Sequence, residues 1–133
     1  MHFFDINDDY EEARRKTELF YKNIGQIWCP SLNDVVIFND AGLKHLIKKG
    51  RLPRPKSEQK RRFFMLRYVK EILRTKHPFS IDERVVAGVV IRCWKFVDTK
   101  NGHTIKIVVR QVEGRKKHFL SVYGKIKNPR RTA

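Results

Sequence analysis

Four side chains near the end of the chain could take part in chemistry: the guanidinium of Arg110, the imidazole of His118, the hydroxyl of Ser121 and the phenol of Tyr123. Guanidinium groups bind phosphate bidentately, imidazole titrates near neutral pH, and hydroxyl and phenol groups donate hydrogen bonds. Brought to one end of a β-sheet, the four groups would form a phosphate-handling surface.

Two β-strands are predicted to carry these residues. β-branched and aromatic residues run on both sides of a break at Glu113-Gly114, a pattern typical of a hairpin. A period of two gives the first strand a cationic face with Lys106 and Arg110 and an apolar face with Ile107 and Val109.

The second strand decides which groups meet the guanidinium. Arg110 is expected to lie opposite Lys117 or His118. Strict alternation places Ser121 and Tyr123 on one face of the strand and His118 on the other, and a slip of one residue reverses this assignment. The register therefore determines whether His118 shares a face with Arg110.

The charge of the chain is far from balanced. Thirty Lys and Arg against 14 Asp and Glu give a formal net charge of +16 and a pI of about 10.3, which is more than solubility requires. The acids cluster in the first dozen residues, and the chain from Lys44 onward is predominantly basic. Such a surface attracts polyanions, so nucleic acid is the expected partner. An anionic membrane surface or an acidic protein would be the alternatives.

Several classes of protein are disfavoured by the sequence. Cys29 and Cys93 are isolated, with no CxxC and no histidine at ligand spacing, so neither a metal nor another cofactor is expected. Reduced thiols are the default, although one disulfide is compatible with the sequence. The chain has no glycine-rich phosphate loop, no signal peptide and no apolar run of about 18 residues. A soluble cytoplasmic protein without a membrane partner is expected.

The predicted fold class is α+β, with N-terminal helices packed on a C-terminal antiparallel β-sheet, a meander, in one domain of 133 residues. An acidic N-terminal helix (1–25) precedes a hairpin and two helices (26–83), antiparallel strands (84–125) and a basic tail (126–133). Helices are expected at about 9–23, 41–49 and 57–74, and the long strands at about 84–98, 103–112 and 116–125. Trp94 and Phe96 are expected in the core, and one sheet face is left free to bind.

Cations also gather in the middle of the chain. Two lysines flank His45 on the second predicted helix, and the prolines of residues 51–56 exclude a helix there, so this segment is predicted as a stiff basic loop. The cations of the third helix, Arg62 among them, are predicted on its outer face. The predicted RNA-binding residues are Lys44, Lys48, Arg51, Arg54, Lys56, Lys106 and Lys117.

A family resemblance is carried by the helix with His45 in GLKHLI, the Arg-Pro loop, the long helix after it, and a meander with Arg110 in IVVRQV and KHFLSVY at its end. Together they resemble the superfamily of small nucleases that groups barnase, EndoU, colicin nucleases and RelE (BECR), especially its phage-linked members. The similarity covers roughly residues 28–123 and is one of element order and scattered residues. It implies a nuclease-like domain that acts as a metal-independent endoribonuclease, toxin-like or phage-linked.

In such a nuclease the ribose 2′-hydroxyl attacks the adjacent phosphate and leaves a cyclic phosphate end. The reaction needs a base for the hydroxyl proton, an acid for the leaving oxygen, and cations at the phosphorane. The resemblance makes His45 and His118 the candidate acid and base, in either order, and Arg110 the bidentate phosphate ligand. Ser121 and Tyr123 would donate hydrogen bonds to a phosphate oxygen or orient a base.

Two other functions fit the same residues. A non-catalytic RNA- or DNA-binding module would need the cations but not the histidines, and would show salt-sensitive binding without cleavage. A protein that presents its basic face to an acidic inhibitor or antitoxin would form a stable complex and lack affinity for nucleic acid.

Overall fold

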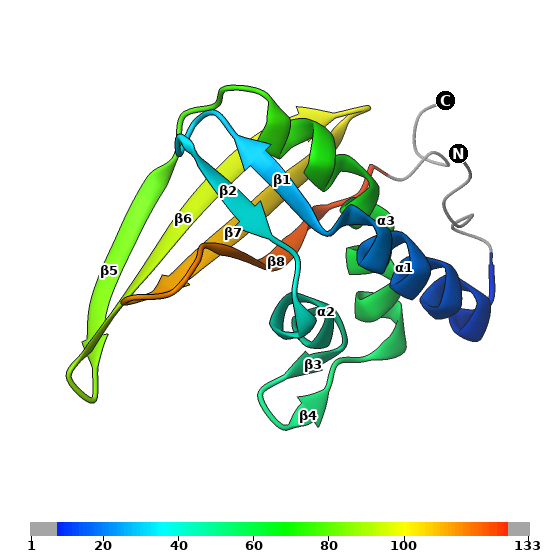
Figure 1. Ribbon diagram of the computed structural model, residues 1–133. Coiled ribbons are helices and arrows are strands. Elements are labelled where there is room, and N and C mark those ends of the chain that lie inside the picture. Colours follow the sequence, from blue (N-terminus) through cyan, green and yellow to red (C-terminus); the bar gives the residue numbers. More distant parts are fainter. Residues whose placement is uncertain (1–7, 128–133) are drawn as a thin grey trace.

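The computed structural model describes residues 8–127 and confirms the predicted α+β class (Figure 1). Three helices lie mainly in the first half of the chain, and the long strands lie in the second half. The elements in chain order are α1 (Tyr10–Ile24), β1 (Gln26–Cys29), β2 (Asp34–Ile37), α2 (Asp40–Ile47), β3 (Lys48–Lys49), β4 (Leu52–Pro53), α3 (Lys56–Arg74), β5 (Ser80–Val86), β6 (Val89–Lys100), β7 (His103–Val112) and β8 (His118–Lys125).

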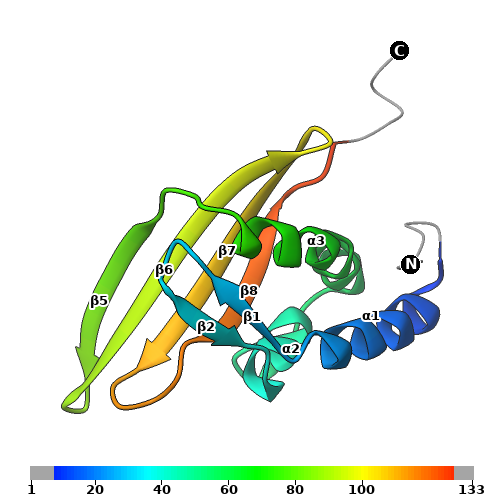
Figure 2. The ribbon, with the colours of Figure 1, turned by 45° about the horizontal axis from the view of Figure 1, so that its top comes forward.

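Six strands form one curled sheet in the order β1-β2-β8-β7-β6-β5. Figure 2 shows the short β1–β2 hairpin beside β8, where Ile37 of β2 lies opposite His118 in parallel orientation. The other neighbouring strands of this sheet are antiparallel. The N-terminal hairpin therefore converts the predicted meander into a mixed sheet and extends it on the β8 side.

Capping residues set the limits of the first helix. The Asp9 carboxylate accepts a hydrogen bond of 2.8 Å from the Glu12 backbone N–H, and Gly25 ends the helix at a φ of 67°. The second helix ends at Ile47, two residues earlier than predicted, because Lys48 and Lys49 pair with Leu52 and Pro53 in a small hairpin. The predicted basic loop at 51–56 therefore contains β4, the second strand of this hairpin.

The core lies between the helices and the apolar face of the sheet. The β7 residues Ile105, Ile107 and Val109 are fully buried, while the residues between them are only partly buried, as the period of two predicts. Trp94 and Phe96 of β6 are 7% and 1% exposed, which confirms their predicted place in the core. α3 packs against β8 and β1, and α2 packs against β8.

A close approach fixes α2 on the sheet. Gly42 of α2 is buried, and a Cβ atom added there would lie 2.5 Å from the Phe119 carbonyl oxygen. The Tyr21 hydroxyl donates a 2.6 Å hydrogen bond to the Asn39 carbonyl, one residue before α2 begins. Glycine is needed at position 42 because any side chain would push the helix, and His45 with it, away from β8.

The prediction of a single strand at 84–98 was wrong. Two strands, β5 and β6, form a hairpin there, and β5 begins at Ser80, four residues before the predicted strand. Ala87 and Gly88 form a two-residue turn, with φ of 50° and 79°. Gly88 marks a full reversal of the chain, so the single strand predicted across it is two antiparallel strands. The flanking valines read as one continuous β-branched run, and alanine rarely adopts positive φ, so the turn was hidden.

Candidate functional site

A β-bulge brings the candidate residues of β7 and β8 to one face of the sheet. Val108 lies opposite Ser121 and Val109 lies opposite Phe119, so Leu120 has no partner on β7. The extra residue reverses the alternation of β8 at this point. As a result His118 lies on the same face as Ser121, although strict alternation predicted opposite faces. Arg110 lies directly opposite His118, which was one of the two expected registers.

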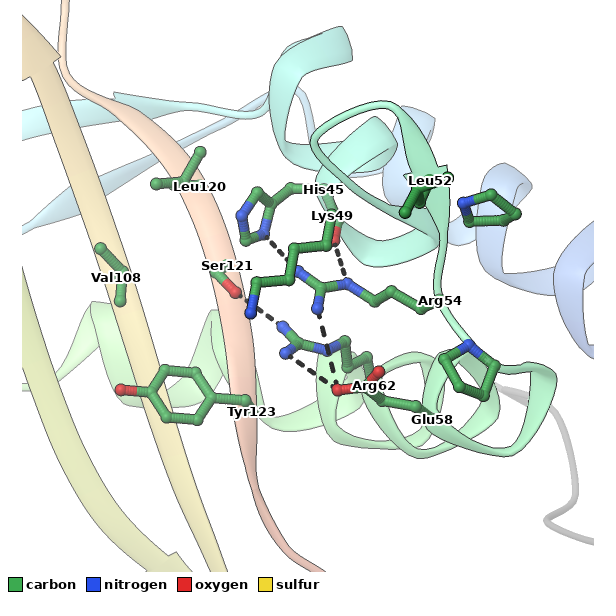
Figure 3. A pocket seen from close by; sticks show the side chains of 12 residues that line it. His45, Lys49, Leu52, Arg54, Glu58, Arg62, Val108, Leu120, Ser121 and Tyr123 are labelled. Carbon is green, nitrogen blue, oxygen red and sulfur yellow. Dashed lines mark hydrogen bonds and ion pairs between the residues drawn. The ribbon is translucent and has the colours of Figure 1, made fainter.

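A cavity of about 550 Å³ opens on this face between α2, the β3–β4 hairpin, α3 and the β7–β8 pair (Figure 3). Three cationic side chains line it with one carboxylate and one imidazole. The lining residues used below are His45, Lys49, Arg54, Glu58, Arg62, Ser121 and Tyr123.

Two buried guanidinium groups share the carboxylate of this cavity. The side chains of Arg54 and Arg62 are only 5% and 11% exposed, and Glu58 lies 3.7 Å from the first and 3.5 Å from the second. The Nε atom of Arg62 is buried and makes no hydrogen bond. Burial and the neighbouring Arg54 lower the pKa of Arg62. The cavity therefore holds more positive charge than its own carboxylate compensates.

His45 lies directly against one of these guanidinium groups. Arg54 donates to the His45 carbonyl at 3.0 Å and lies 3.3 Å from Nδ1 of the ring. Burial, followed by the charges of Arg54, Arg62 and Arg110, lowers the pKa of His45 to about 4. The ring is neutral at pH 7, and because Nδ1 faces an N–H donor, we assign the ring proton to Nε2. Figure 3 shows that second nitrogen turned away from Arg54.

Ser121 and Tyr123 extend the cavity along β8. Nη1 of Arg62 donates to the Ser121 hydroxyl at 2.9 Å and approaches the Val122 carbonyl at 3.3 Å. The Tyr123 ring lies within about 6 Å of three cations, with Lys106 at 5.7 Å, Arg62 at 5.8 Å and Lys95 at 6.0 Å from its centroid. This arrangement concentrates donors and positive charge at one edge of the cavity.

The other two predicted catalytic residues line a second cavity, of about 660 Å³. Arg110 donates from Nε to His118 Nε2 at 3.2 Å. The His118 side chain is buried, with the residue 6% exposed. Burial and the charge of Arg110 lower its pKa, and a hydrogen bond with the Lys116 backbone partly offsets this by raising the pKa. His118 thus contacts both Arg110 and the Lys116 backbone, and the imidazole orients Arg110, whose two terminal nitrogens have no hydrogen-bond partner among residues 8–127. Arg115 and Lys116 line the same cavity.

The structure therefore separates the predicted groups into two neighbouring cavities. His45 lies with Ser121 and Tyr123 in the first, while Arg110 and His118 lie in the second, and the two histidines share neither. The charge of Arg110 nevertheless acts on His45, so the cavities are close together.

The predicted RNA-binding residues take different positions. Arg54 is buried in the first cavity, and Lys106 lies over Tyr123. Lys117 lies apart from both, 2.7 Å from Asp34 and over the Trp94 ring. Lys56 lies over the Tyr10 ring. The remaining three are exposed and line neither of the two cavities, namely Lys44, Lys48 and Arg51.

Two charged residues of the first cavity were not predicted as site residues from the sequence, and a third was misplaced. Lys49 and Glu58 were not considered, and Arg62 was expected on the outer face of α3, whereas its side chain is 11% exposed and lies in the cavity. A usable signal was the spacing of four between Glu58 and Arg62, which places their side chains on one side of the third helix.

Residues 8–127 contain no cluster of three His, Cys, Asp or Glu side chains that could hold a metal ion, and none of the helices described there is long and apolar enough to cross a membrane. Comparisons with protein-family models, curated proteins and solved structures find no match to this chain.

Proposed function

We propose that the chain is a metal-independent endoribonuclease that cleaves RNA by attack of the ribose 2′-hydroxyl on the adjacent phosphate. The observation that carries this proposal is the pair of buried guanidinium groups, Arg54 and Arg62, which share one carboxylate beside a neutral imidazole. Buried positive charge without compensation is costly, and a bound anion relieves it. A phosphodiester supplies such an anion.

The cavity holds groups for each step of this reaction. The Glu58 carboxylate accepts the proton of the attacking 2′-hydroxyl. Arg54, Arg62 and the Nε2–H of neutral His45 stabilise the charge that develops on the phosphorane oxygens, as fixed donors do in other enzymes. The Lys49 ammonium at the cavity wall donates a proton to the leaving 5′-oxygen, which completes the transfer that leaves a cyclic phosphate end. His45 acts here as a hydrogen-bond donor, because its Nδ1 is held by Arg54.

The second cavity supports a polymeric substrate. Arg110 is held by His118 beside Arg115 and Lys116, so it provides a binding place for a neighbouring phosphate of the same strand. A single-stranded RNA that crosses both cavities would be held at more than one phosphate.

The test compares adjacent arginines of α3. Cleavage of mixed RNA in EDTA is measured for the wild type, Arg62→Ala, His45→Ala and the control Arg61→Ala, which removes an equal charge from an exposed position. We expect losses of about 10²–10³ for the two cavity variants and a change of less than about twofold for the control. Equal loss in both arginine variants would contradict the proposal.

A non-catalytic RNA-binding module is the second candidate function, because three cations surround Tyr123 on an open face. It predicts salt-sensitive binding by every variant and intact RNA in each reaction.

A further inference from the structure

Strand β5 leaves one edge of the sheet open. It pairs only with β6, all seven of its residues are exposed, and Figures 1 and 2 show no element beyond it. In the described residues, six of the nine exposed large hydrophobic side chains lie between Phe79 and Val97, on or beside this hairpin. Edge strands are usually protected by charged side chains, above all lysine, by proline or by a bulge; β5 has no lysine, proline or bulge, and its three charges, Asp82, Glu83 and Arg84, include both signs.

The β5–β6 register shows which backbone groups are available for pairing. Val86 and Val89 flank a two-residue turn and form a hydrogen-bonded pair. Because hydrogen-bonded and non-bonded pairs alternate, Ile81, Glu83 and Val85 direct their N–H and C=O groups to the open edge.

The sequence of β5 is complementary to itself in antiparallel orientation. With Glu83 at the centre, Ile81 lies opposite Val85 of a second copy, and Asp82 lies opposite Arg84 of that copy. Two-fold symmetry repeats each pair, which gives two apolar and two oppositely charged pairs. The two Glu83 carboxylates meet at the axis, but each is paired with Arg92 of its own chain at 2.5 Å.

We propose that two copies of this chain pair through their β5 edges and form one continuous sheet. The charge of the strand selects a second copy over an acidic partner, because β5 carries two acids and one arginine in a chain of net charge +16. No β5 residue lines the two cavities described above, so the interface is independent of the proposed nuclease site.

The test is a charge exchange measured by sedimentation velocity over a range of protein concentrations. In each single variant, Asp82→Arg or Arg84→Asp, residue 82 of one copy and residue 84 of the other carry the same charge, and the two-fold axis repeats this repulsive pair. We expect each variant to weaken the dimer at least about tenfold. The double variant Asp82→Arg/Arg84→Asp restores opposite charges in the same register and is expected to dimerise within about threefold of the wild type. Circular dichroism of each variant checks that the hairpin remains folded.

A wild type that stays monomeric at the highest concentration would overturn the proposal. A dimer that both single variants leave unchanged would place the interface elsewhere and equally refute it, as would a double variant no tighter than the single ones. The readout is mass, so an inactive protein that dimerises would leave this inference standing.

Discussion

At the residue scale, burial and positive neighbours hold His45 neutral. Its folded-state pKa of about 4 lies below the value of 6.5 for a histidine in solution, so the unfolded chain binds a proton first as the pH falls. The associated stability is complete above pH 6.5 and is lost between there and pH 4.

This predicts that the wild type loses more stability than His45→Gln on acidification. Urea unfolding at about pH 7 and pH 4.5 should show an additional loss of about 2 kcal/mol in the wild type, after allowance for partial exposure of the ring. Glutamine keeps an acceptor for Arg54 but does not titrate. Parallel stability curves for the two proteins would contradict the burial of a neutral imidazole.

The same pKa constrains catalysis. If neutral His45 donates a hydrogen bond, its own titration lies near pH 4 in the free protein. The pH profiles of kcat/KM for the wild type and His45→Gln should then be alike near pH 6.5. An ionisation near pH 6.5 that disappears in this variant would instead indicate a histidine that transfers protons.

Arg110 provides a prediction about binding. A phosphate contact contributes about 0.7 to the slope of log K against log salt on a single strand. Arg110→Ala should lower the slope by about that amount, while Lys70→Ala, at an exposed position that lines neither cavity, should leave it unchanged. His118→Ala should weaken binding less than Arg110→Ala, since the imidazole only orients the guanidinium. An unchanged slope for Arg110→Ala would remove this residue from the interface.

At the element scale, the contact of α2 with β8 positions His45 over the sheet. Gly42→Ala adds a Cβ against the Phe119 backbone, which cannot move without distorting β8. We expect a loss of about 3 kcal/mol of unfolding free energy, measured by urea denaturation. Lys44→Ala, on the exposed side of the same helix, should change stability by less than about 0.5 kcal/mol. Equal effects of the two substitutions would mean that α2 is loosely held.

Elements with local signals could be predicted from the sequence. The helix predicted at about 9–23 is observed at Tyr10–Ile24, where Asp9 caps the start and Gly25 ends it, and Asn101-Gly102 is a strong hairpin signal at the observed β6–β7 turn. The turn at Ala87-Gly88 was missed because valines surround it. The bulge at Leu120 has no local signal, since leucine fits either face of a strand, and only the pairing of Phe119 and Ser121 with β7 reveals it.

The site could be predicted only in part, and for a physical reason. His45, Arg110, His118, Ser121 and Tyr123 do face two neighbouring cavities. Arg62 was placed outside because an arginine near a helix start is usually solvated. Its burial depends on Ser121 and Glu58, and Ser121 comes from β8, far along the chain.

At the scale of the whole molecule, the positive charge lies in two different environments. Exposed lysines raise the affinity for any polyanion and are screened by salt, whereas the charges of Arg54 and Arg62 in the first cavity are 5% and 11% exposed and are screened much less. Association with RNA should therefore depend steeply on salt, and the chemical step in the bound complex should depend on it weakly.

The most direct measurement of the central claim uses an RNA oligonucleotide with one ribose replaced by 2′-deoxyribose at a cleaved position, incubated with the protein in EDTA. The account predicts that cleavage at that position stops, that it continues elsewhere, and that the fragments carry cyclic phosphate ends. Cleavage at the deoxy position, cleavage that requires a divalent cation, or an intact oligonucleotide bound by the protein would contradict the proposed function.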